Sequence, residues 1–113
     1  MHELSIAQSI VDIVEETMNG EPETNLIEVV VDVGELVAVV PESLEFCYTA
    51  LTDSTKYAGS KLVINILPVL ARCDDCRQEF KVENITFVCP RCNSVKLKIL
   101  QGQELKISHL EVQ

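Results

Sequence analysis

The chain has no long apolar run, and basic side chains are scarce in its first 70 residues. Its longest apolar stretch, Leu62 to Leu70, is interrupted by Asn65 and Pro68 and is too short to cross a bilayer. Nothing at the N-terminus resembles a secretion signal, so we expect a cytoplasmic protein with no membrane partner. A phosphate-binding loop and a nucleophile–base pair are also missing, which argues against an enzyme.

Charge is distributed unevenly along the chain. Residues 1–70 hold twelve acidic and two basic side chains, residues 71–103 hold four acidic and six basic ones, and the net charge is −9. The acidic part would repel the phosphates of a nucleic acid, so we expect no nucleic-acid partner. The basic side chains of residues 71–103 either face solvent or meet an acidic protein.

Four of the five cysteines form two close pairs, Cys73 with Cys76 and Cys89 with Cys92. Two residues between cysteines let both thiolates of a turn bind one metal ion, and two such turns complete a tetrahedral shell of four sulfurs. The spacing predicts a zinc ribbon whose metal is structural, because four protein ligands leave no open position. A disulfide framework and iron at the same four thiolates are the alternatives.

The rest of the sequence predicts an α+β arrangement of helices and strands. Apolar residues recur at helical spacing from Leu4 to Met18, before Gly20 and Pro22 stop the helix. Residues 27–33 alternate with a period of two, as in a strand with one buried face. A second helix begins at Pro41, and its apolar stripe comprises Leu44, Cys47, Tyr48 and Leu51, which makes Cys47 a core residue.

Two further strands are expected at residues 62–66 and 105–112, the second with a bulge near Ser108 and His109. Inside the ribbon we expect a hairpin at residues 79–88 and a return strand at 96–100. The predicted fold is therefore two helices packed on a three-stranded sheet, with an inserted zinc-ribbon domain that binds its metal through four cysteines. The main domain would comprise residues 1–70 plus 104–113, and the zinc-ribbon domain would comprise residues 71–103.

The opening residues Met1-His2-Glu3 form a second candidate metal site. The imidazole of His2 can bind one ion together with the α-amine of Met1 and deprotonated backbone nitrogens, a planar donor set that favours Ni(II) or Cu(II) over zinc. Glu3 adds a carboxylate that can take an axial position or orient His2. The alternative is an incidental histidine at a frayed terminus, although the helical pattern starting at Leu4 leaves little slack.

The whole chain resembles the HypA/HybF nickel-insertion proteins of NiFe hydrogenase maturation. The resemblance rests on the opening Met1-His2-Glu3-Leu4-Ser5, on Val33-Gly34-Glu35, on the helix start Pro41-Glu42-Ser43-Leu44-Glu45-Phe46, and on the cysteine quartet. It implies a nickel metallochaperone whose α/β domain carries Ni(II) as cargo at Met1, His2 and Glu3. It also implies structural Zn(II) at Cys73, Cys76, Cys89 and Cys92.

The same resemblance implies partners. These are the GTPase HypB, the NiFe hydrogenase large-subunit precursor that receives the nickel and, in some bacteria, the urease maturation proteins. Some members of the family have an aspartate before the second helix as a further nickel ligand, but this chain has Val39-Val40-Pro41 there, so we do not expect that ligand. The rival interpretation is a zinc-ribbon protein-interaction module without nickel function.

Overall fold

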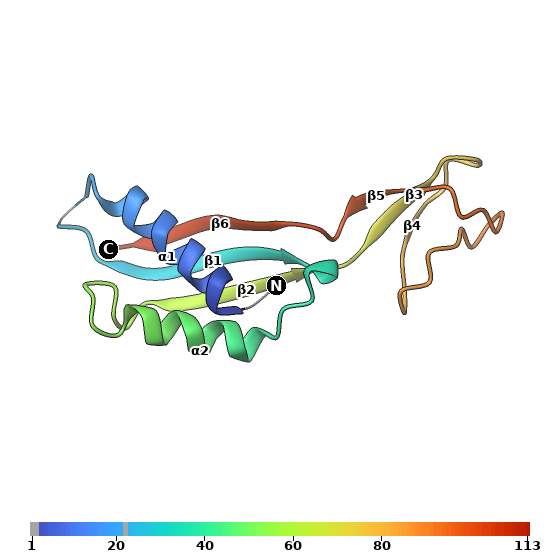
Figure 1. The fold of residues 1–113 in the computed structure, drawn as a ribbon. Coiled ribbons are helices and arrows are strands. Elements are labelled where there is room, and N and C mark those ends of the chain that lie inside the picture. The colour runs from blue at the N-terminus through green and yellow to red at the C-terminus, as the bar shows by residue number, and fades with distance from the viewer. Residues whose placement is uncertain (1–2, 22) are drawn as a thin grey trace. The chain divides into compact units, whose positions relative to one another are not determined.

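The computed structural model describes residues 3–21 and 23–113, so Met1, His2 and Pro22 lie outside the description (Figure 1). Its elements are α1 (Glu3–Met18), β1 (Leu26–Gly34), the 3-10 helix η1 (Glu35–Val37), α2 (Pro41–Thr52), β2 (Lys61–Leu67), β3 (Leu70–Cys73), β4 (Glu79–Lys81), β5 (Leu97–Gln101) and β6 (Leu105–Val112). The strands form two three-stranded sheets, in the orders β2-β1-β6 and β4-β3-β5. The predicted fold class is confirmed: two helices and a three-stranded sheet, with a four-cysteine ribbon inserted between β2 and β6.

Two compact units make up the chain. The body comprises Met1–Asp32, Val39–Asn65 and Lys106–Gln113, and the ribbon unit comprises Val33–Ala38 and Ile66–Leu105. The ribbon unit therefore includes the residues on both sides of the cysteine-containing segment, together with the short segment that contains η1. The division into a main domain of residues 1–70 plus 104–113 and a zinc-ribbon domain of residues 71–103 stays a prediction.

The core of the body lies between the two helices and the central strand β1. Figure 1 shows α1 and α2 on the same face of this sheet, and Val29 and Val31 are almost completely buried on β1. The buried residues of α1 recur at helical spacing: Ile6, Ala7, Ile10, Val11, Val14 and Met18. The predicted first helix is thus confirmed. The predicted strand is confirmed as β1, but its expected single buried face is wrong, because Ile27 is exposed and Val30 is buried along with Val29 and Val31.

Helix α2 begins at Pro41, as predicted, because proline suits the first helical position, where its missing N–H is no loss. Leu44 and Tyr48 are buried, and the Tyr48 hydroxyl is 2.7 Å from Ser60 Oγ. Burial raises the pKa of Tyr48 despite this hydrogen bond. Cys47 is only half-buried, so the prediction that it is a core residue is wrong.

The ribbon is built on β3, which pairs antiparallel with β4 on one side and with β5 on the other. Its apolar cluster is small: Val69, Ala71 and Val82 are buried, with Phe80, Phe87, Leu97 and Ile99 partly buried against them. The predicted return strand is confirmed as β5. The hairpin predicted at residues 79–88 is wrong, because β4 pairs with β3 and ends at Lys81.

Backbone geometry explains why β4 is short. Asn84 and Ile85 both have positive φ angles, 54° and 57°, which no extended strand can accommodate.

On β6, the half-buried residues Ile107 and Leu110 are three apart rather than two, and the bulge expected near Ser108 stays a prediction. Within residues 3–21 and 23–113, no helix combines the length and apolarity needed to cross a membrane.

Gly34 generates the first prediction. A Cβ at this position would clash with the carbonyl of Gly102 and the backbone nitrogen of Gln103, and Gly34 N–H is held by a 2.7 Å hydrogen bond to Glu104 O. We expect Gly34→Ala to lower the free energy of unfolding by about 2 kcal/mol or more, because backbone atoms must move apart.

Urea denaturation of Gly34→Ala, wild type and Gly20→Ala would measure this effect. No atom lies within 4 Å of a Cβ added at Gly20, so that control should change stability by about 0.5 kcal/mol at most. Equal midpoints for Gly34→Ala and Gly20→Ala would contradict the close approach.

Candidate metal centre

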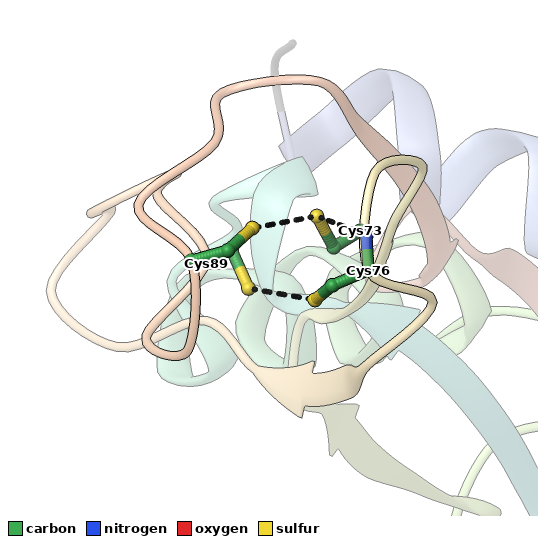
Figure 2. A group of neighbouring side chains, drawn as sticks. Cys73, Cys76 and Cys89 are labelled. Carbon is green, nitrogen blue, oxygen red and sulfur yellow. Dashed lines mark hydrogen bonds between the residues drawn. The ribbon is translucent and has the colours of Figure 1, made fainter.

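The ribbon brings all four of its cysteines together. Their sulfurs lie within 4.8 Å of one another, with Cys73 Sγ 3.5 Å from Cys92 Sγ and Cys76 Sγ 3.6 Å from Cys89 Sγ. Figure 2 shows the side chains of Cys73, Cys76 and Cys89 directed toward a common centre. A disulfide would need about 2.05 Å, whereas sulfurs bound tetrahedrally to zinc at about 2.3 Å are about 3.8 Å apart. The donor set therefore fits a tetrahedral metal ion, and all four cysteines are free.

Two turns of the same design present these sulfurs. In the first, Cys73 N–H donates to Gln78 O and Cys73 O accepts from Arg77 N–H, both at 2.9 Å. In the second, Cys89 makes the same two bonds, to Ser94 O and from Asn93 N–H, also at 2.9 Å.

Each turn reverses at a residue with positive φ, 69° at Arg77 and 64° at Asn93. Asparagine often adopts this conformation, but arginine gives no such signal in a sequence. The cysteine spacing thus predicted the two turns but not their backbone geometry.

The two turns also share an order of burial. Cys73 and Cys89, the first cysteine of each turn, are completely buried. Cys76 is half-buried, and Cys92 is exposed. The centre is therefore closed on one side by protein and open to solvent on the side of the second cysteines.

Backbone N–H groups influence the ionisation of the thiols. The N–H of Cys76, 3.5 Å from Cys73 Sγ, holds the pKa of Cys73 below its usual value, with help from the N–H of Asp75. Burial opposes ionisation of Cys89, but the N–H groups of Cys92 and Arg91 outweigh it and lower the pKa of Cys89 to about 7.

Cys92 behaves in the opposite way. The backbone N–H of Ser94 favours its thiolate, yet hydrogen bonding with Cys73 and burial raise the pKa of Cys92 to about 12. Adjacent thiolates repel one another, so the four cannot all ionise together without a cation. A metal that binds all four sulfurs therefore displaces protons.

Of the N-terminal candidates, Met1 and His2 lie outside the described residues, and Glu3 is the first residue of α1. Glu3 Oε2 accepts a 3.1 Å hydrogen bond from the backbone N–H of Val40, the residue before α2. Glu3 also borders a shallow hollow of about 460 Å³ with the α2 residues Glu42, Ser43, Phe46 and Cys47 and with Leu4. Sequence reasoning did not identify Val40, because a backbone donor carries no sequence signal.

Comparison with known proteins identifies relatives along the full length of the chain. A family model described as "Hydrogenase/urease nickel incorporation, metallochaperone, hypA" matches residues 1–112. A hydrogenase maturation factor HypA from Trichodesmium erythraeum is 44% identical, with 100% of this chain and 96% of that protein covered. One from Geotalea uraniireducens is 38% identical, with 100% of both chains covered.

Solved structures show the same fold. The solution structure of the Ni metallochaperone HypA from Helicobacter pylori matches with a TM-score of 0.68 and 27% identity, covering 98% of this chain and 97% of the other. A second solution structure, of a HypA protein, matches with a TM-score of 0.74 and 27% identity, covering 100% and 97%.

The cysteine cluster generates the second prediction. Full-length protein should bind one equivalent of Co(II) with the intense visible absorption of a tetrahedral thiolate site, because Co(II) accepts the same ligand geometry as zinc. Cys89→Ser removes a buried ligand and should abolish this spectrum. Cys47→Ser changes the one cysteine outside the cluster and should leave the spectrum intact. If both variants bind Co(II) like wild type, the quartet is not the metal site.

Proposed function

The chain belongs to the HypA family of hydrogenase/urease nickel incorporation metallochaperones, and we propose that it binds Ni(II) at its N-terminus and delivers it to the NiFe hydrogenase large-subunit precursor. Urease is the other nickel enzyme in the family's description. In this proposal the chain works with the GTPase HypB in the cytoplasm, and it carries metal rather than catalysing a reaction.

The observation that carries the proposal is the hydrogen bond between Glu3 Oε2 and Val40 N–H. It joins the first turn of α1 to the residue before α2, so the residue that follows His2 has a defined place in the body. The α-amine of Met1, the imidazole of His2 and backbone nitrogens would supply planar nitrogen donors, which suit Ni(II). Glu3 would act mainly by positioning this terminus.

Delivery requires release, and the proposed nickel site suits release. Ligands at a chain terminus can be exchanged one at a time for those of a recipient protein. The cysteine quartet would instead hold Zn(II) permanently, because four thiolates on two rigid turns form a closed shell. The two metals would therefore have separate tasks, zinc for structure and nickel as cargo.

The third prediction tests the terminal site directly. Zinc-loaded protein with its native Met1 terminus should bind one equivalent of Ni(II) with the absorption bands of a planar nitrogen site. Addition of one glycine before Met1, or His2→Ala, should abolish that spectrum, because either change breaks the chelate rings. If both altered proteins bind nickel like wild type, the site lies elsewhere and the interaction-module interpretation becomes the better one.

The fourth prediction separates positioning by Glu3 from direct ligation. Glu3→Ala removes the acceptor for Val40 N–H and should weaken Ni(II) affinity about 10-fold, as is typical when a residue supporting a metal ligand is lost. Glu3→Gln keeps an oxygen acceptor without the charge and should retain near-native affinity in isothermal titration calorimetry.

Glu42→Ala is the matched control, because Glu42 borders the same hollow from the first turn of α2. It should bind nickel like wild type. If Glu3→Gln loses as much affinity as Glu3→Ala, the carboxylate binds nickel itself and the positioning role is wrong.

A further inference from the structure

Two residues that are not metal ligands join the cysteine turns to each other. Asp75 lies inside the first turn, between Cys73 and Cys76, and Ser94 follows Cys92 in the second. Ser94 Oγ donates a hydrogen bond to Asp75 Oδ2 at 2.5 Å, within the range of a charge-assisted O–H···O⁻ bond. The two residues are 19 positions apart, so this bond connects the two turns at the protein surface.

Ser94 holds the second turn in place with its remaining polar groups. Its carbonyl accepts from Cys89 N–H at 2.9 Å, and its Oγ accepts from Lys96 N–H at 3.1 Å. The hydroxyl hydrogen is directed toward Asp75, because an ionised carboxylate can only accept, and Oγ still has a lone pair for Lys96 N–H. Lys96 O in turn accepts from Asp74 N–H at 2.8 Å, which makes a second link back to the first turn.

The bond between Asp75 and Ser94 lies close in the sequence to one particular pair of sulfurs. Cys73 lies two residues before Asp75, and Cys92 lies two residues before Ser94. These two sulfurs are the pair that lies 3.5 Å apart. The bond between Asp75 and Ser94 therefore joins the same two turns that bring these two sulfurs together.

We infer that Asp75 and Ser94 form a clasp that positions Cys73 and Cys92 for one metal ion and slows the escape of that ion. The inference rests on the metal-binding role of the quartet in the proposed function. An isolated surface hydrogen bond contributes little to stability, but this bond fixes the separation of two turns whose sulfurs must meet within a few tenths of an ångström. Loss of either side chain would leave all four cysteines present, but the distance between the two turns would no longer be held.

The test compares zinc release from full-length wild type, Asp75→Ala, Ser94→Ala and the double variant, measured by transfer to a chromogenic chelator. Each single substitution should speed release about 10-fold, the lower end of the effect of residues that support metal ligands. The double variant should release zinc no faster than either single variant, because the two side chains act as one bond. Ser94→Thr keeps the hydroxyl and should restore slow release.

Asp74→Ala is the matched control, because it removes a neighbouring exposed carboxylate of the same charge and leaves the Asp74 backbone bond to Lys96. It should release zinc like wild type.

The Co(II) spectra should show four thiolates in every variant, with bands shifted only when the clasp is broken.

Several outcomes would overturn the clasp. Unchanged release in both single variants would do so, as would strictly additive effects or an Asp74→Ala effect as large as that of Asp75→Ala. Wild-type protein that binds neither Zn(II) nor Co(II) would overturn the clasp and the structural zinc together. Normal metal binding with unchanged release would overturn the clasp alone and leave the proposed function intact.

Discussion

The meeting of four thiols at one point is the interaction on which the ribbon depends. The apolar cluster around Val69, Ala71 and Val82 is too small to hold the two cysteine-containing turns in place by itself. The same pair of backbone hydrogen bonds at Cys73 and at Cys89 holds each turn. These turns place the four sulfurs at spacings that suit a tetrahedral ion. Cys73 is the last residue of β3, where it pairs with Leu97 of β5. The register of this sheet therefore fixes the position of one of the four sulfurs.

The two proposed metal sites differ in how their ligands are held. The thiols come from turns whose backbone groups are already paired, so each ligand is restrained on both sides. The proposed nickel donors belong to a chain end, and Glu3, the residue that follows them, accepts a hydrogen bond from Val40 N–H. In the proposed function one metal is retained and the other is transferred, and this difference in restraint suits that division.

The sequence predicted those parts of the fold in which one physical pattern dominates. Periodicity identified α1 and β1, proline marked the start of α2, and paired cysteines located both turns. Strand β3 was missed because Leu70–Cys73 is short and reads as a connection after Pro68. The left-handed conformations of Arg77 and Ile85 had no signal, because these residue types disfavour positive φ and adopt it here only through their surroundings. The bond between Asp75 and Ser94 was equally hidden, since it joins distant polar residues that belong to no periodic pattern.

The unequal exposure of the cysteines sets an order for the chemistry of the centre. A competing ligand or an oxidant arriving from solvent meets Cys92 first, then Cys76, and reaches the buried sulfurs of Cys73 and Cys89 last. Cys92 lies at the solvent-exposed end of the second turn, three residues after the buried Cys89. Chemical attack on the centre is therefore expected to begin at the exposed end of the second turn and to reach the sheet side last.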